Sequence, residues 1–204
     1  MSFFALLKKQ SVIVLMVALW IPAVGSGINV LWKYSTTPGK AATPPAQWPG
    51  DAPVARADGR ATLVMFAHPQ CPCTSASVGE LAIIMAHHSS GLDADVYFYA
   101  PKNKPEGWVK NDLWKMAAAI PGVRVFEDHE AAAAQSFGAF TSGQVLLYDS
   151  QGSLEFNGGI TAFRGHSGDN AGRTVITSLL QDGAPRRNDL PVRTPVLGCS
   201  LRGE

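Results

Sequence analysis

An uninterrupted apolar segment near the amino terminus constrains most strongly what this chain can fold into. No residue from Gln10 to Trp32 is charged, and residues 12–21 are all apolar. About 20 residues, rising roughly 1.5 Å each, cross the hydrocarbon core of a bilayer as a helix. No polar face accompanies the apolar residues, so a core helix of a water-soluble domain is the less suitable interpretation. We therefore predict an amino-terminal membrane anchor over residues 1–34.

Basic residues beside this segment indicate its orientation. Lys8 and Lys9 precede it and Lys33 follows it, and the positive-inside rule then puts the amino terminus in the cytoplasm. A signal peptide has a similar basic start, but residues 23–27 contain no A-x-A cleavage site and the apolar character continues to Trp32. Both interpretations export the rest of the chain. We predict a single-pass membrane protein with a periplasmic or extracytoplasmic carboxyl-terminal domain, and cleavage stays open.

The composition changes after the apolar segment. Residues 35–59 contain five prolines, which disfavour helix and sheet, so this stretch is predicted to be a Pro-rich linker. A folded domain is expected over residues 60–182, followed by an irregular tail over residues 183–204. The net charge of the chain is +1, and the absence of a basic stripe argues against a nucleic-acid partner.

Apolar strands and amphipathic helices alternate through the predicted domain. Strands are expected at residues 61–67, 94–100, 122–127, 143–149 and 153–159, and helices at residues 72–88, 107–120, 129–139 and 169–181. This order predicts an α/β fold with a largely parallel central sheet and helices on both of its faces. Turn residues between the last two strands predict a hairpin, which makes one edge of the sheet antiparallel.

Two cysteines separated by one residue, Cys71-Pro72-Cys73, occupy the junction between the first strand and the first helix. Cys71 is expected near the helix N-cap, with Pro72 at the first helical position. The unpaired N–H groups and the positive end of the helix dipole favour a thiolate over a thiol there. Ligands of such folds also meet the carboxyl ends of the strands. The junction therefore predicts redox or metal chemistry.

The order of elements, together with this cysteine pair, resembles the thioredoxin-like superfamily over about residues 58–182. The string His-Pro-Gln-Cys-Pro-Cys at 68–73, the string Thr-Ser-Gly at 141–143 and the Gly-Cys pair at 198–199 are most similar to the small RedB-like group of membrane-anchored proteins. The resemblance implies a thioredoxin-like central sheet flanked by helices. It also implies a Cys-Pro-Cys site that exchanges electrons with thiols.

Two departures from the family pattern concern the site. The family's usual site is Cys-x-x-Cys, whereas one spacer residue is missing here. The family also carries a cis-proline opposite the cysteines, and the matching positions here are Thr141 and Ser142. If the family arrangement applies, both hydroxyls face the sulfurs and are able to hydrogen-bond a thiolate. Loss of the proline weakens the expectation that the site handles substrates in the usual way.

These features predict an extracytoplasmic, membrane-anchored thiol-disulfide oxidoreductase that acts on exported thiol or disulfide proteins without a cofactor. Cys71 is the expected attacking thiolate, Cys73 the expected resolving thiol, and a bridge between them is expected to be strained and labile. The first alternative is a copper or zinc binding or chaperone module that uses Cys71, Cys73 and His68. The second is a non-catalytic interaction domain. The roles of Cys199 and His166, the substrate, the electron donor, the reaction direction and the oligomeric state stay open.

Overall fold

The chain consists of two compact units, which meet between residues 37 and 38. The computed structural model describes residues 3–56, 59–181 and 192–202. The first unit is the helix α1 (Phe3–Thr36). Within it, Ser11–Thr36 has a mean hydropathy of 2.1, which makes α1 long and apolar enough to cross a membrane.

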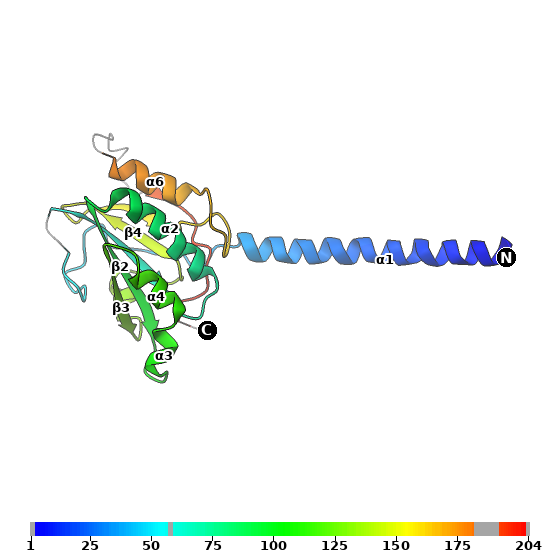
Figure 1. The fold of residues 1–204 in the computed structure, drawn as a ribbon, viewed down its shortest axis with the longest axis horizontal. Coiled ribbons are helices and arrows are strands. Elements are labelled where there is room, and N and C mark those ends of the chain that lie inside the picture. Colours follow the sequence, from blue (N-terminus) through cyan, green and yellow to red (C-terminus); the bar gives the residue numbers. More distant parts are fainter. Residues whose placement is uncertain (1–2, 57–58, 182–191, 203–204) are drawn as a thin grey trace. The chain divides into compact units, whose positions relative to one another are not determined.

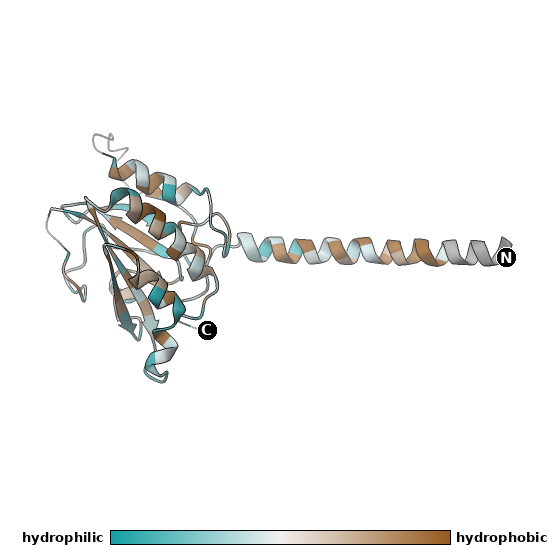
Figure 2. Ribbon diagram, viewed as in Figure 1, coloured by the Kyte–Doolittle hydropathy of each residue, from teal (hydrophilic) through white to brown (hydrophobic). Residues whose placement is uncertain are grey.

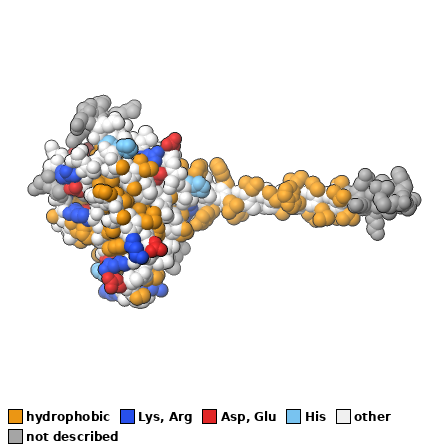
Figure 3. All heavy atoms as spheres, in the orientation of Figure 1, with side chains coloured by type: hydrophobic (Ala, Val, Ile, Leu, Met, Phe, Trp, Pro, Cys, Tyr) orange, Lys and Arg blue, Asp and Glu red, His pale blue; other side chains and the backbone are white. Residues whose placement is uncertain are grey.

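The side chains of α1 suit a lipid environment. From Val12 onward its large apolar residues are exposed, as Val14 (67% exposed) and Leu19 (65%) illustrate. Brown, apolar residues recur along this helix in Figure 2, and apolar side chains cover its surface in Figure 3. On the second unit, the face seen in Figure 3 carries basic and acidic side chains interspersed, in keeping with a net charge of +1.

The second unit is built on one mixed sheet of six strands among the described residues, in the order β3-β2-β1-β4-β5-β6 (Figure 1). The strands are β1 (Ala61–Ala67), β2 (Leu92–Ala100), β3 (Val123–His129), β4 (Gln144–Tyr148), β5 (Leu154–Gly158) and β6 (Val192–Arg193). β1 is parallel to β2 and antiparallel to β4, and β4 and β5 form the predicted hairpin. The predicted α/β class and the antiparallel hairpin are confirmed.

Central strand β1 is buried on both faces of the sheet. Its alternate residues Leu63 and Met65 enter one apolar cluster, and Val64 and Phe66 enter the other. This two-sided burial explains why the strand reads as a continuous apolar run rather than an alternating one. The site is therefore attached to a central strand that is buried on both faces.

Helices cover the two faces unequally. The helices α2 (Cys73–His88), α4 (Asp112–Ala118) and α6 (Ala171–Leu180) contribute buried residues to the first cluster. The second cluster receives only the short helix α5 (Ala132–Ser136) among the described helices. Much of that second face is left for other segments to cover.

The Pro-rich segment covers part of that face, which corrects the expected linker over residues 35–59. From Pro38 onward the described residues belong to the compact second unit. The Trp48 ring lies 5.0 Å from that of Phe137 and 5.2 Å from that of Tyr148, and the Trp48 amide donates to Gly152. The prolines keep this segment from forming a regular strand, although Gln47 forms an isolated antiparallel bridge with Ser153. The Trp48 side chain gains by covering aromatic rings that are buried in the domain.

Two predicted helices are shorter than expected. The segment 107–120 divides into α3 (Glu106–Val109) and α4, because the side chain of Asn111 caps a new helix by accepting from two backbone N–H groups. The segment 129–139 holds only α5, because Glu130 and Ala131 adopt positive φ angles of 54° and 56° immediately before it.

The carboxyl-terminal tail, expected to be irregular over residues 183–204, is partly ordered against the domain. Residues 182–191 and 203–204 lie outside the described residues. Of the remainder, β6 pairs with β5, and the buried Leu201 enters the second apolar cluster. The tail therefore returns to the sheet instead of leaving it.

Candidate active site of three cysteines

Cys71 lies in the tight turn that joins β1 to α2. Its amide donates to the carbonyl of His68 at 3.1 Å, and its own carbonyl accepts from Thr74 at 3.0 Å. Pro72 is the N-cap residue and Cys73 begins the helix, one position later than the sequence predicts. The turn fixes Cys71 immediately before the helix, where unpaired backbone N–H groups favour a negative sulfur.

Cys199 reaches this turn from the carboxyl-terminal tail. The amide of Ser142 donates to the carbonyl of Cys199 at 2.8 Å, and the amide of Leu201 donates to the carbonyl of Phe140 at 2.9 Å. Thr141 and Ser200 form an antiparallel bridge between these two bonds. The tail thus runs as a short extra strand along the segment that precedes β4.

A glycine permits this close approach. A Cβ atom on Gly198 would overlap the carbonyl of Ser142, so only a residue without a side chain allows the two backbones to lie this close. The Gly-Cys pair noted in the sequence therefore has a physical role. Glycine allows the tail to dock, and the next residue carries the sulfur.

The docked tail brings two distant sulfurs together. The Sγ atoms of Cys71 and Cys199 are 2.9 Å apart and belong to free thiols. Cys71 is 2% exposed and Cys73 is 7% exposed, whereas Cys199 is half-buried. Cys199 is thus the least buried residue of the three.

Hydrogen bonds outweigh burial at Cys71. Burial acts to raise the pKa of its thiol, but hydrogen bonds from the Cys199 thiol and backbone N–H, and then from the backbone N–H and thiol of Cys73, lower it below the ordinary value. The thiolate is therefore stabilised at Cys71 by donors from both the turn and the tail.

The other two thiols have raised pKa values. Burial and then the neighbouring Cys71 raise the pKa of Cys73, and Arg164 partly opposes this rise. Burial, the hydrogen bond to Cys71 and the charge of Cys71 raise the pKa of Cys199 to about 12, again with Arg164 acting in the opposite direction. Of the three sulfurs, Cys71 is therefore the one that ionises most readily, with the thiols of Cys73 and Cys199 as its hydrogen-bond donors.

His68, predicted near the site, is held by neighbouring rings. Its ring centre lies 5.5 Å from that of Trp108 and 5.9 Å from that of Tyr99, and its Nδ1 accepts from the amide of Gln70. Burial lowers the pKa of His68. Within residues 3–56, 59–181 and 192–202, no group of three or more His, Cys, Asp or Glu side chains is arranged to hold a metal ion. The predicted ligand set of His68 with two cysteines is therefore not assembled.

Thr141 and Ser142 are buried beside the site, but their hydroxyls bond elsewhere than expected. The hydroxyl of Thr141 donates to the carbonyl of Lys40 at 3.0 Å. The hydroxyl of Ser142 accepts from the amide of His68 at 2.9 Å and lies 3.0 Å from that of Thr74. These residues serve the site through their backbone, which holds the tail. No peptide bond among the described residues is cis.

The loop between β5 and α6 supplies a charge that the sequence does not reveal. His166 was the open candidate in this loop, but its side chain is exposed and its Nδ1 lies 2.9 Å from the carbonyl of Arg164. Arg164 is the residue that acts electrostatically on Cys73 and Cys199. A Cβ atom on Gly165 would lie 4.0 Å from the Cα of Cys73, which confirms that the loop crosses the site.

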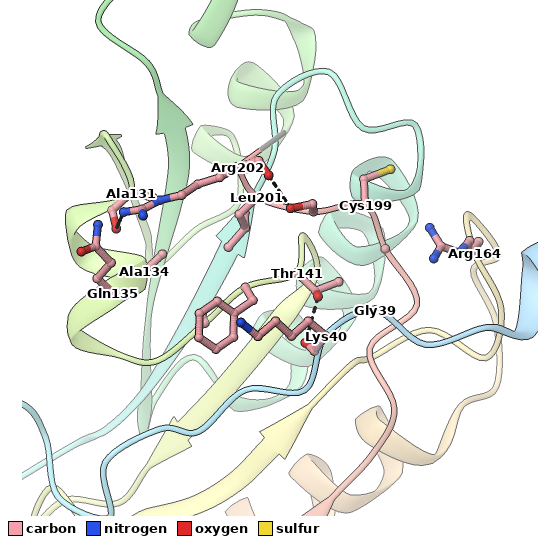
Figure 4. Close-up of a pocket in the computed structure, with 14 residues that line it drawn as sticks. Gly39, Lys40, Ala131, Ala134, Gln135, Thr141, Arg164, Cys199, Leu201 and Arg202 are labelled. Atoms are coloured by element: carbon pink, nitrogen blue, oxygen red, sulfur yellow. Dashed lines mark hydrogen bonds between the residues drawn. The ribbon is translucent and has the colours of Figure 1, made fainter. Parts of the chain in front are cut away.

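A cavity of about 570 Å³ opens beside Cys199, within the range typical of ligand sites. Three basic residues, Lys40, Arg164 and Arg202, contribute to its lining, and none of the described residues that line it is acidic. Figure 4 shows Arg164 on the β5–α6 loop near Cys199, with Lys40 and Arg202 on opposite walls. The least buried cysteine of the cluster therefore lines a positively charged cavity.

The topology and the place of the cysteines define the class. A parallel β1-α2-β2 unit, an antiparallel β4-β5 hairpin followed by α6, and a cysteine turn at the carboxyl end of β1 form a thioredoxin-like fold. The predicted fold class is thus confirmed, including the single apolar helix that precedes the domain.

Comparisons with solved structures agree with this fold. An uncharacterized conserved protein from Geobacillus kaustophilus is similar with a TM-score of 0.56 and 20% identity, over 83% of this chain and 95% of that chain. A hypothetical protein from Sinorhizobium meliloti has the same TM-score and identity, over 83% and 98%. The exposed lipoprotein thioredoxin of Streptococcus pneumoniae is less similar, with a TM-score of 0.45 and 16% identity, over 60% of this chain and 84% of that chain. No family model and no curated protein matches the chain.

Proposed function

We propose that this protein is a thiol-disulfide oxidoreductase, anchored by α1, that exchanges electrons with the thiols or disulfides of exported proteins. The observation that carries the proposal is the buried Cys71 thiol, whose pKa is lowered by hydrogen bonds from Cys199 and Cys73. A thiol with a lowered pKa ionises at lower pH than an ordinary cysteine and is a better leaving group in disulfide exchange.

The location outside the cytoplasm is part of the same proposal. Disulfides form and persist in oxidising compartments outside the cytoplasm, and they are rare in cytosolic proteins. Lys8 and Lys9 before the apolar segment favour a cytoplasmic amino terminus. This orientation puts the three cysteines where exported proteins acquire or exchange disulfides.

The proposal is tested with the full-length chain in detergent. The rate at which glutathione disulfide oxidises a synthetic two-cysteine peptide is measured for the natural protein and for Cys71→Ser. We expect the natural protein to accelerate the reaction and the variant to return it to the uncatalysed rate. An unchanged rate in Cys71→Ser would show that the site is inert and would favour a non-catalytic interaction domain.

The pH dependence of alkylation gives a second test. Iodoacetamide reacts with the thiolate, so Cys71 is expected to reach half of its maximal rate below pH 9.0, the ordinary value for a cysteine thiol. Cys71 is measured in the Cys73→Ser variant, where peptide mapping separates it from Cys199. A Cys71 that titrates as an ordinary cysteine contradicts the proposal.

A further inference from the structure

We propose that the redox pair of this protein is Cys71 with Cys199, and that Cys199 is the sulfur that partner thiols attack. The inference rests on the proposed function and deepens it. It identifies which cysteine pairs with Cys71 and the direction in which electrons are transferred. It replaces the expected pair of Cys71 with Cys73.

The first argument is proximity. The 2.9 Å between the Sγ atoms of Cys71 and Cys199 needs only a small movement to reach the disulfide bond length of about 2.05 Å. The backbone of Cys199 is fixed by its hydrogen bond from Ser142, and the Cys71 turn is fixed by Thr74. Both sulfurs are therefore held in place by ordered backbone before any bond forms.

The second argument is access. Cys71 is 2% exposed, so a cysteine of another protein does not reach it while the tail is docked. Cys199 is half-buried and lines the basic cavity with Arg164 and Lys40. A partner thiolate that enters this cavity is attracted by the positive charges and meets Cys199 first.

The third argument is the leaving group. When a partner thiolate attacks Cys199 of the Cys71–Cys199 disulfide, Cys71 leaves as a thiolate. In the mixed disulfide Cys199 has no S–H to donate, but the backbone N–H groups of Cys199 and Cys73 and the Cys73 thiol still stabilise the Cys71 thiolate, and exchange is faster when the departing thiol has a low pKa. Attack on Cys71 would instead expel Cys199, whose pKa is raised first of all by burial.

The reaction balances without a further reagent. The first thiolate of a partner dithiol bonds to the Sγ of Cys199, and the Cys71–Cys199 bond breaks. The second thiolate of the partner then attacks the partner's own sulfur in this mixed disulfide, which releases Cys199. The partner loses two electrons and two protons and becomes a disulfide, while Cys71 and Cys199 gain them and become thiols. Stabilisation of the Cys71 thiolate favours this direction, so the oxidised protein acts as the oxidant of an exported dithiol.

Peptide mapping tests the pairing directly. Trypsin is expected to release Cys71 and Cys73 together in residues 61–102 and Cys199 in residues 194–202. The full-length protein is oxidised with diamide in detergent, alkylated and digested without reduction. We expect the two peptides to be joined in the natural protein and in Cys73→Ser, and to be separate in Cys199→Ser. A bridge confined to residues 61–102 in the natural protein would overturn the proposal.

A pulse of glutathione, used as a monothiol probe on the oxidised protein, identifies the attacked sulfur. After acid quenching, we expect the glutathione adduct on residues 194–202, with Cys71 recovered as a free thiol. An adduct on residues 61–102 would overturn the assignment of Cys199. These results are separate from the proposed function, which fails if the natural protein does not accelerate oxidation of the two-cysteine peptide, if Cys71→Ser accelerates it equally, or if Cys71 titrates as an ordinary cysteine.

Discussion

Two segments meet at the sulfur cluster, and the domain holds them in different ways. The Cys-Pro-Cys turn lies between adjacent elements, and buried groups behind it fix the helix that follows. The tail that carries Cys199 arrives from far along the chain and is held by backbone hydrogen bonds to residues 140–142 and by the buried side chain of Leu201. The turn is thus held by elements next to it in the sequence, and the tail by contacts with remote segments. The difference teaches that a sulfur at a helix start can be identified from local sequence, but the sulfur that lies against it cannot.

The support behind the turn depends on a buried carboxylate. Glu80 of α2 is fully buried and accepts from the amide of Gly168 at 2.7 Å and from Asn170 at 3.1 Å. It also forms an ion pair with Arg173 of α6. These contacts fasten α2 to α6 and to the loop that carries Arg164.

Breaking the ion pair between Glu80 and Arg173 is expected to have the largest effect, a loss of unfolding free energy. Arg173→Met leaves the Glu80 charge buried without its partner, which costs about 3–5 kcal/mol of unfolding free energy. Urea unfolding of the full-length chain in detergent, followed by tryptophan fluorescence, measures it. The double variant with Glu80→Leu is the control, and we expect it to recover most of the loss. Equal stability of Arg173→Met and the natural protein would show that the ion pair between Glu80 and Arg173 does not stabilise the domain.

The tail is expected to detach with a smaller loss of stability. Gly198→Ala introduces a Cβ that overlaps the carbonyl of Ser142, so the tail has to move away from the site. We expect hydrogen exchange to accelerate at the amides of Ser142 and Leu201 and the Cys71–Cys199 bridge to form more slowly. Gly107→Ala is the matched control, because its Cβ meets nothing within 4 Å. Unchanged hydrogen exchange at these amides in Gly198→Ala would show that the tail docks without a glycine at position 198.

Removal of each donor separates the two contributions to the Cys71 thiolate. Among the hydrogen bonds that lower the pKa of Cys71, the one from the Cys199 thiol has the largest effect and the one from the Cys73 thiol has the smallest. Both Cys199→Ala and Cys73→Ala are therefore expected to raise that pKa, with the larger rise in Cys199→Ala. Less thiolate is then present at any pH below 9. The pH dependence of alkylation measures both shifts, and the reverse order would show that the turn alone governs Cys71.

The smallest expected effect concerns Arg164. Its charge lowers the pKa of Cys73 and Cys199 against the larger effect of burial, so Arg164→Gln is expected to raise both values further. Cys199 then leaves a mixed disulfide more slowly, and alkylation of Cys199 shifts to higher pH. Arg164→Lys retains the charge and is the control. Identical profiles in all three proteins would exclude an electrostatic role for the loop.

Local patterns predict the fold and half of the candidate site. The bounds of β1 agree with the expected strand, and α2 begins one residue late, because a buried apolar run and a proline at a helix start are local signals. The prediction of a free linker over residues 35–59 is wrong because it uses only local signals. Its prolines exclude regular structure, but whether Trp48 packs on Phe137 depends on the sparse helical cover of that face of the sheet.

The residues that sequence reasoning missed act across long separations. Glu80 and Arg164 belong to segments far apart along the chain, yet both bear on the cysteine turn or its helix. The Gly-Cys pair was the available signal for Cys199, because a glycine beside a cysteine allows close backbone approach. No spacing rule relates it to Cys71.

The sequence by itself determined an apolar helix able to cross a membrane, an α/β domain and a cysteine at the end of its central strand, since each depends on neighbouring residues. Only the tertiary structure decided which sulfur lies against Cys71. That choice depends on where a distant tail pairs its backbone, and backbone pairing between remote segments leaves almost no trace in local residue patterns.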